Sequence, residues 1–249
     1  MNKVDFTHSK YIELLDAIRD GGLKINTVRD FISSGPKNDF VILRHDVEYK
    51  ISKSISIAEI EADKGISATY YVHGPQRSVC DISVLKEMQE MGHEIGYHYE
   101  TLDLCAGDHT KAMSMFEEQL KYLRDSGLVI DTVCSHGNPR VQKNGWSDNK
   151  EIFIKDDNAL IRNNLIGEAY LSIDLDQLEY LSDVGIRWKA AKNTRFLSRR
   201  IGRGHLTRIY ILTHPDYWSK TAMEALAWRY AAKTLRATKL NKVIAKLRR

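Results

Sequence analysis

Segments typical of strands and of helices alternate along most of this chain. The run Asp39–Asp46 is apolar in its centre and ends in charged residues, which is typical of a strand buried on both faces. Apolar side chains then recur at helical spacing from Ile51 to Ala62, and Ser67–Val72 is β-branched and aromatic, as strands are. The same reasoning predicts helices at Val84–Met91, at Met113–Leu123 and from Lys220 onward, and strands at His93–His98, Leu128–Cys134 and Arg208–Thr213. Residues 139–171 show no clear pattern. The alternation predicts a mostly parallel sheet covered by helices, either open or closed into a barrel.

Length and composition favour a single domain. The 249 residues, 43% of them hydrophobic, suffice for one sizeable core, and we expect one domain over residues 1–249. The sequence contains no stretch of 18 apolar residues that could span a bilayer. Its first residues are interrupted by acidic side chains and do not resemble a secretory signal. The three cysteines are widely spaced and form no CxxC pair, which argues against a disulfide framework or a zinc-thiolate site and favours a cytoplasmic location.

Positive charge is concentrated near the end of the sequence. Residues 219–249 contain nine Lys or Arg and one Glu, a net charge of +8, whereas the remainder carries a net charge of −4. An apolar stripe runs through this basic segment, formed by Leu240, Val243, Ile244 and Leu247. We expect a basic helix over about residues 219–249 that either lies on anionic lipid at the inner face of a membrane or packs its apolar side on the domain. No RNA- or DNA-binding motif accompanies the charge, so nucleic acid is not an expected partner.

Residues able to bind a metal or move a proton follow most of the predicted strands. They are His45, Asp46 and Glu48 at the first strand, His73 at the second, His98 and Glu100 at the third, His136 at the fourth and His214 at the last. In a parallel α/β fold the carboxyl ends of the strands lie on one face, where active sites form. One such histidine alone is more often structural, but five successive strand ends indicate a functional site.

Local spacing selects which of these groups converge. Residues two apart on a strand point the same way, so Asp46 and Glu48 are expected to converge while His45 faces away. A hard oxygen ligand with imidazoles suits zinc or another first-row divalent ion, and zinc is the metal we expect. The alternative for Asp46 is a helix N-cap or a salt bridge to Arg44.

One segment resembles a known family. GHEIGYHYETL at Gly92–Leu102 is similar to the second motif, GHEIGNHTxxH, of the polysaccharide deacetylases, the NodB-homology or carbohydrate esterase family 4 proteins. Shorter segments resemble the other motifs of the family in order and spacing, over residues 38–218: LRHDVE at Leu43–Glu48, SHGNP at Ser135–Pro139, SDVGIRW at Ser182–Trp188 and ILTHP at Ile211–Pro215. The HDVE and GYHYE segments further resemble a WbmS-like branch associated with bacterial surface-polysaccharide loci.

The resemblance implies a distorted (β/α)7 barrel that removes N-acetyl, and sometimes O-acetyl, groups from glycans with a bound divalent metal. It places Asp46 at the metal-binding Asp, His98 at the first metal-binding His, and His214 at the general acid that protonates the leaving amine. Two positions depart from the pattern. The family's catalytic-base Asp corresponds to His45, and its second metal-binding His corresponds to Leu102, which cannot ligate a metal.

Other groups at the strand ends are expected to complete the site. We expect His136, and after it Glu100, to supply the missing ligand, and Glu48 or His45 to act as base. Asp183 is expected to orient His214. Substrate contact is expected from His45, His73 and Trp188, with Tyr217 or Trp218 as further candidates for stacking on a sugar ring.

The expected activity is removal of an N-acetyl group from a sugar or glycan precursor in bacterial surface-polysaccharide metabolism. Two alternatives stay open. The first is a non-catalytic glycan-binding protein that keeps the deacetylase fold but has lost the metal, as the two departures suggest. The second is a metal hydrolase of the same fold that acts on a small amide.

Overall fold

The computed structural model describes residues 4–35, 38–138, 145–156 and 158–237. Its strands are β1 (Lys24–Asn26), β2 (Phe40–Val47), β3 (Thr69–Val72), β4 (Glu94–Tyr99), β5 (Thr132–Ser135), β6 (Gly167–Glu168), β7 (Glu179–Ser182) and β8 (Arg208–Thr213). Within the described residues they form one parallel sheet in the order β6-β5-β4-β3-β2-β8-β7, with β1 beside the first half of β2. β6 and β7 are the two edge strands of this sheet, and within the described residues they are not hydrogen-bonded to each other. The sheet is therefore the distorted, open (β/α)7 barrel that the sequence predicted.

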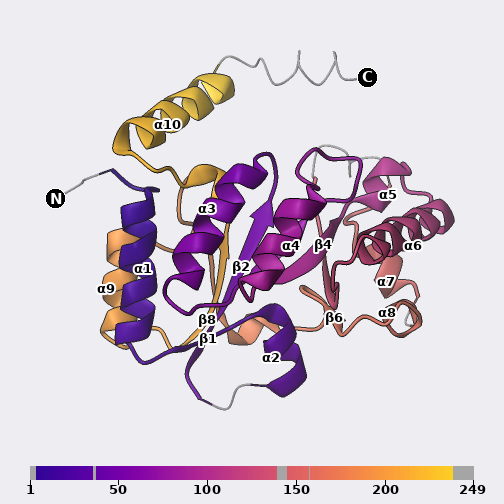
Figure 1. Cartoon of the computed structure of the whole chain (residues 1–249), viewed down its shortest axis with the longest axis horizontal. Helices are drawn as coiled ribbons and strands as arrows, with labels where there is room; N and C mark the ends of the chain where they lie inside the picture. The colour runs from indigo at the N-terminus through magenta and orange to yellow at the C-terminus, as the bar shows by residue number, and fades with distance from the viewer. Residues whose placement is uncertain (1–3, 36–37, 139–144, 157, 238–249) are drawn as a thin grey trace.

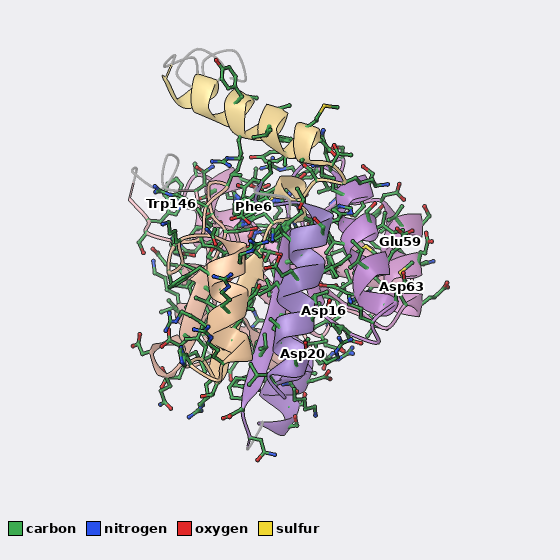
Figure 2. The ribbon with its side chains drawn as sticks, turned by 90° about the vertical axis from the view of Figure 1, so that its left-hand side faces the viewer. Phe6, Asp16, Asp20, Glu59, Asp63 and Trp146 are labelled. Carbon is green, nitrogen blue, oxygen red and sulfur yellow. The ribbon has the colours of Figure 1, made fainter. Side chains whose placement is uncertain are left out.

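Helices cover the outside of the sheet (Figure 1). They are α1 (His8–Asp20), α2 (Val28–Ser34), α3 (Ile51–Ala62), α4 (Ile82–Glu90), α5 (Thr101–Leu104), α6 (His109–Asp125), α7 (Glu151–Ile154), α8 (Ala159–Arg162), α9 (Thr194–Gly202) and α10 (Ala222–Ala237), with 3-10 turns η2 (Leu175–Gln177) and η3 (Pro215–Tyr217). α1 and α9 lie side by side, and α10 stands apart at one end (Figures 1 and 2). No described helix is long and apolar enough to cross a membrane.

α1 illustrates why these segments form helices. The Thr7 side chain accepts a hydrogen bond from the Lys10 amide and caps the first turn. One face, at helical spacing, is buried on the sheet: Tyr11, Leu14, Leu15 and Ile18. Asp16 and Asp20 lie on the other face, toward solvent (Figure 2). This amphipathic helix was not among the sequence predictions.

Alternation along β2 divides its side chains between two environments. Val41 and Leu43 pack with the apolar residues of the covering helices, whereas Phe40 and Ile42 pack in the barrel interior beside Tyr71. The interior needs a glycine at position 96, because a Cβ there would lie 2.3 Å from the Tyr71 ring. Every second side chain of a strand points into the barrel. A residue that continues this alternation just beyond the end of its strand therefore lies at the same end of the barrel as the corresponding residues of the other strands.

The predicted strands and helices are present, with shifted bounds. The predicted strand at Leu128–Cys134, for example, is reduced to β5, and the strand predicted from His93 begins at Glu94. Within residues 145–171, α7, α8 and β6 are each four residues or shorter, too short for a periodic pattern to be recognised. Helix is described at the end of the chain only as far as Ala237, and the stripe from Leu240 to Leu247 lies outside the described residues.

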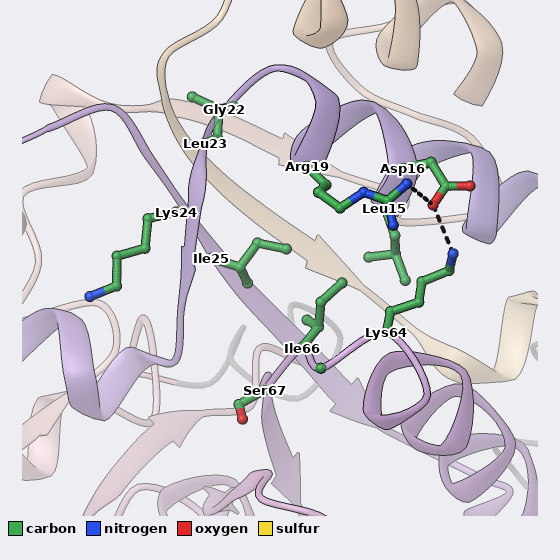
Figure 3. Close-up of a pocket in the computed structure, with 11 residues that line it drawn as sticks. Leu15, Asp16, Arg19, Gly22, Leu23, Lys24, Ile25, Lys64, Ile66 and Ser67 are labelled. Carbon is green, nitrogen blue, oxygen red and sulfur yellow. Dashed lines mark hydrogen bonds and ion pairs between the residues drawn. The ribbon is translucent and has the colours of Figure 1, made fainter.

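A pocket lies at the amino ends of β1 and β3, away from the strand ends that carry the histidines. Its cavity measures about 430 Å³ and is lined partly by Leu23, Ile25 and Ile66. Asp16 and Lys64 form an ion pair of 2.7 Å at its edge (Figure 3). The lining contains no histidine or cysteine, and the candidate metal-binding side chains lie at the other end of the sheet.

Candidate metal centre

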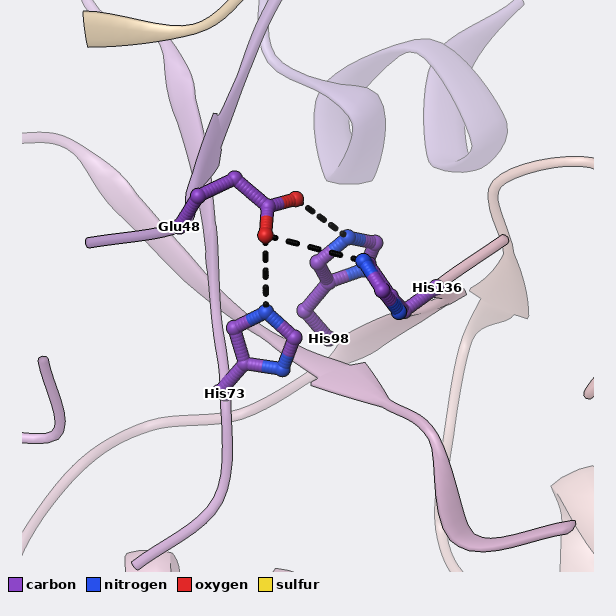
Figure 4. A group of neighbouring side chains, drawn as sticks. All are labelled: Glu48, His73, His98 and His136. Atoms are coloured by element: carbon purple, nitrogen blue, oxygen red, sulfur yellow. Dashed lines mark hydrogen bonds and ion pairs between the residues drawn. The ribbon is translucent and has the colours of Figure 1, made fainter. Parts of the chain in front are cut away.

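Four side chains from successive strand ends converge on one point (Figure 4). They are Glu48, His73, His98 and His136, and one ligand atom from each lies within 4.8 Å of all the others. The Nε2 atoms of His73 and His136 are 3.3 and 3.5 Å from Oε2 of Glu48, and Nε2 of His98 is 3.7 Å from Oε1. Among the described residues this is the group of His, Cys, Asp and Glu side chains arranged to hold a metal ion.

The strand pattern explains the convergence. Glu48 lies two residues beyond Asp46, and His73 lies two beyond Tyr71, so both continue the interior series of their strands. His136 follows β5 directly, and its amide donates a 2.8 Å hydrogen bond to the Tyr99 carbonyl, which prolongs the pairing of β4 with β5. The three loops that follow β2, β3 and β5 therefore begin at the same edge of the barrel.

The polar groups behind the three imidazoles turn their Nε2 atoms inward. Nδ1 of His98 is 3.0 Å from the Cys134 carbonyl, and that acceptor requires the proton on Nδ1. Nδ1 of His73 and of His136 are buried without a hydrogen bond, yet each faces a Glu100 oxygen, at 3.5 and 3.6 Å. A carboxylate behind metal-binding histidines is the usual way in which their rings are oriented. Three imidazoles with a carboxylate beside them therefore suit zinc or another first-row divalent ion.

Glu100 is itself held by an arginine. Arg77 donates from Nε and Nη2 to the two carboxylate oxygens, at 2.8 and 2.7 Å. Burial would raise the pKa of Glu100, but the hydrogen bond and charge of Arg77, together with the charges of His73 and His136, lower that pKa. Glu100 was predicted as a ligand, and the structure places it behind the rings of His73 and His136 instead of among the ligand atoms.

The charge states of Glu48 and His73 favour metal binding, whereas at His136 a metal ion has to displace a proton. Burial would raise the pKa of Glu48, but hydrogen bonds from His136, His73 and His98 lower it far below its ordinary range, so the carboxylate is ionised. Burial lowers the pKa of His73, which keeps this ring neutral and able to donate a lone pair. The pKa of His136 is raised, because the adjacent Glu48 outweighs the effect of burial.

Asp46, the expected family ligand, is engaged elsewhere. Both of its oxygens accept 2.8 Å hydrogen bonds from the fully buried Arg44, and Oδ2 is 3.6 Å from Nε2 of His98. Burial would raise the pKa of Asp46, but the charge and hydrogen bonds of Arg44, together with the charges of His98 and His214, lower that pKa. Arg44 in turn lies over the rings of Tyr71 and Tyr170, at 5.0 and 4.7 Å. The salt bridge that the sequence left as an alternative for Asp46 is the arrangement observed.

His214 and Asp183 form a second buried pair at the same end of the sheet. Nδ1 of His214 is 2.7 Å from Oδ1 of Asp183, whose Oδ2 accepts a 3.0 Å bond from Nε1 of Trp218. Burial alone would lower the pKa of His214, but the charge and hydrogen bond of Asp183 raise it to about 9. The ring is therefore protonated at neutral pH and held by the residue predicted to orient it.

Two residues expected to contact substrate are buried instead. His45 has no exposed surface and faces the helices, with Nε2 2.8 Å from Glu61 and Nδ1 2.6 Å from the Thr213 hydroxyl. Trp188 is 5% exposed and packs with Phe6 and Trp218. Neither side chain has surface available for a sugar, which corrects both expectations. Trp218 is fully buried as well, and Leu102 belongs to the hydrophobic core.

Sequence patterns did not predict three features in and beneath the site. His73 was expected only to contact substrate, although its position two residues beyond Tyr71 would have placed it on the interior face. Arg77, which fixes Glu100, lies in a loop without a periodic pattern and gave no signal. Glu61 was not singled out, because a single Glu on a predicted helix is normally solvated.

The fold was compared with those of solved structures. The catalytic domain of a peptidoglycan N-acetylglucosamine deacetylase from Eubacterium rectale superimposes with a TM-score of 0.51 at 12% identity, over 79% of this chain and 86% of that one. The fold is that of a polysaccharide deacetylase. No family model and no curated protein matches the sequence.

Other structures with the deacetylase fold give lower scores. A family 4 carbohydrate esterase from Streptomyces lividans, in complex with acetate, has a TM-score of 0.46 at 14% identity, over 80% of this chain and 88% of that one. A family 4 pseudoenzyme from Bacillus anthracis has a TM-score of 0.45 at 14% identity, over 80% of this chain, which spans 62% of that protein. The narrower WbmS-like placement stays a prediction.

Proposed function

We propose that this chain is a metal-dependent hydrolase that removes an N-acetyl group from a sugar or glycan precursor in bacterial surface-polysaccharide metabolism. The observation that carries the proposal is the convergence of Glu48 with three histidines at the strand ends. The fold shared with the Eubacterium rectale deacetylase supports a carbohydrate substrate. A cytoplasmic location is part of the proposal and is supported by three cysteines that are all free thiols.

The three imidazoles are the groups that we assign to the cation. His73, His98 and His136 each direct Nε2 toward the centre, and each has a carbonyl or carboxylate behind Nδ1. When bound, a divalent cation supplies Lewis acidity toward an amide carbonyl and lowers the pKa of water. These three histidines would hold the ion, and three is the number of protein ligands usual in catalytic zinc sites.

Glu48 is the group that we assign as general base. Its carboxylate lies beside the Nε2 atoms of the three imidazoles, where it can accept a proton from water. In amide hydrolysis the attacking water must lose a proton, and a carboxylate within hydrogen-bond reach of that water takes it. The family resemblance places the base at position 45, so in this chain the role falls three residues further along.

His214 is the group that we assign as general acid. An amine leaves an amide readily only if it is protonated, and a histidine with a pKa of about 9 carries that proton at neutral pH. Asp183 binds Nδ1, which leaves Nε2 of the ring as the donor.

Tyr49 is the aromatic residue that we assign to sugar contact. It follows Glu48 directly, and 64% of its surface is exposed. Its amide and that of Glu48 donate to the Asp216 carboxylate, at 3.1 and 3.3 Å, which fixes the loop after β2. An exposed ring at the rim of a site is suited to stack on a pyranose.

The test is acetate release by the purified chain supplied with zinc, cobalt or manganese. N-acetylglucosamine oligomers and a nucleotide-linked N-acetyl sugar are compared with acetamide and N-acetylglycine. We expect release from the sugars, and its loss in Glu48→Gln. Release from the small amides alone would favour the amide hydrolase, and the absence of both bound metal and acetate release would favour the glycan-binding alternative.

A further inference from the structure

α10 leaves an apolar surface uncovered at the end of the molecule that carries the metal centre. It stands off the body at the end toward which β2 points (Figure 1). Three large side chains on it are exposed: Met223 by 81%, Leu226 by 49% and Tyr230 by 76%. Their spacing of three and four residues places them on one face of the helix. We call these three residues the outer face of α10.

The opposite side of α10 is attached to the body. Nζ of Lys53, on α3, lies 3.1 Å from a Glu224 oxygen and donates to the carbonyl groups of Asp216 and Trp218, both at 3.1 Å. The Trp228 ring lies over Nζ of Lys53, at 5.6 Å, and over that of Lys50, at 5.4 Å. These contacts fix which side of the helix faces away from the body.

The sequence left two roles open for the basic tail, packing on the domain or contact with lipid. On the described part of α10, the large apolar residues of the outer face point away from the body. If this face were packed on the domain, these residues would be buried. Scattered single apolar residues on a surface are ordinary, but three on one helical face form a patch.

Charge indicates what covers this patch. Residues 219–249 carry a net charge of +8, whereas the rest of the chain carries −4. A helix that combines an exposed apolar face with dense Lys and Arg matches an anionic bilayer, where apolar residues enter the interface and cations meet the headgroups. Nucleic acid would use the charge but would leave Met223 and Leu226 exposed to water.

We propose that the outer face of α10 docks on the surface of an anionic lipid bilayer, and that the net positive charge of residues 219–249 attracts the protein to that surface. The loop from Glu48 to Lys50 leads from the metal centre to the Trp228 ring, so docking holds the centre close to the membrane surface. Only this last consequence rests on the proposed deacetylase function. Lipid binding itself requires neither metal nor catalysis.

The experiment is sedimentation of the full-length protein with sucrose-loaded vesicles. Vesicles of phosphatidylcholine alone are compared with vesicles that also contain phosphatidylglycerol, at low and at high salt. We expect binding to the anionic vesicles that weakens at high salt. Met223→Glu with Leu226→Glu should weaken it by about tenfold or more, because apolar contact is replaced by two like charges at the anionic surface. Lys239→Gln with Lys242→Gln should weaken it to a similar extent, since each lysine near the surface adds about 1 kcal/mol.

The matched control is Ile161→Glu, which changes a side chain with 75% exposure on α8, away from α10. It should bind vesicles as the unchanged protein does, and far-UV circular dichroism should show that all variants are folded. The proposal is overturned if neutral and anionic vesicles bind equally, if the α10 variants bind undiminished, or if a DNA duplex binds as tightly and competes with the vesicles. Because no substrate is present, none of these results bears on deacetylation.

Discussion

Side-chain direction along single strands decides which residues reach the metal centre. His45 and Asp46 are neighbours in sequence, yet one contacts Glu61 under the helices and the other binds Arg44 inside the barrel. Period-two alternation predicted that His45 would face away and that Glu48 would face inward. Alternation alone could not decide that Asp46 forms a salt bridge with Arg44. That contact depends on how side chains pack inside the barrel around Tyr71 and Tyr170.

Glu100 should strengthen metal binding without touching the metal. In Glu100→Gln the rings of His73 and His136 lose the carboxylate behind them, and we expect zinc affinity to fall by about 10- to 100-fold. Competition with a chromogenic chelator measures this affinity. Glu87→Gln, an exposed change on α4, is the control. An unchanged affinity in Glu100→Gln would show that the rings are oriented without it.

The His214–Asp183 pair predicts an alkaline limit on activity. The folded pKa of His214 is raised to about 9, so the protonated acid is present at neutral pH and is lost as pH rises through about 9. Stability follows the same sign: the contribution of this pair is complete below the unfolded pKa near 6.5 and disappears through about pH 9. In Asp183→Asn the alkaline limb of the kcat profile should move to lower pH, whereas Asp176→Asn, exposed on η2, should leave it unchanged. A limb that stays in place in Asp183→Asn would remove His214 from the acid role.

Elements were predictable from sequence where they are long and regular. β2, α3 and α6 each carry a pattern over eight residues or more, and each was found close to its predicted position. β6 and β7 have two and four residues and gain their place only by pairing with β5 and β8, contacts that a local pattern does not contain. The same limit explains why the order of the strands could not be read from the sequence.

Glu61 joins several elements beneath the site. Its carboxylate, on α3, accepts hydrogen bonds from Tyr11 of α1 and from Tyr70 of β3, and it faces His45 of β2. The carboxylate is fully buried, so its removal leaves three polar side chains without their shared partner.

Glu61→Ala should therefore lower the free energy of unfolding by roughly 3–5 kcal/mol, as measured by urea denaturation. Glu59 lies on the outer face of the same helix (Figure 2), and Glu59→Ala should change it by less than about 0.5 kcal/mol. Equal effects of the two changes would mean that the buried network does not stabilise the fold. Metal content per folded molecule should be the same in both variants, because Glu61 faces away from the centre.

At the scale of the whole molecule, the barrel brings together strand ends that are far apart in sequence. The alternation of strands with helices predicted a parallel sheet and the face that carries the chemistry, and the family resemblance predicted the (β/α)7 barrel. The sequence assigned the ligands less well. The family pattern pointed to Asp46, whereas the geometry favours His73, His98 and His136 around Glu48. Glu48, His98 and His136 lie in segments that resemble the family's motifs, whereas His73 lies outside them.

The central claim is that these three histidines hold one divalent ion and leave Glu48 free as a base. The most direct test is the metal content of protein purified without chelator and exposed to zinc, measured by mass spectrometry together with acetate release. The unchanged protein, Glu48→Gln and the control His109→Ala should each bind about one equivalent, and Glu48→Gln should lose activity by about 100-fold or more. His73→Ala, His98→Ala and His136→Ala should each lose most of the metal while remaining folded. An unchanged protein that binds no metal, or a His136→Ala variant that keeps a full equivalent, would contradict the account.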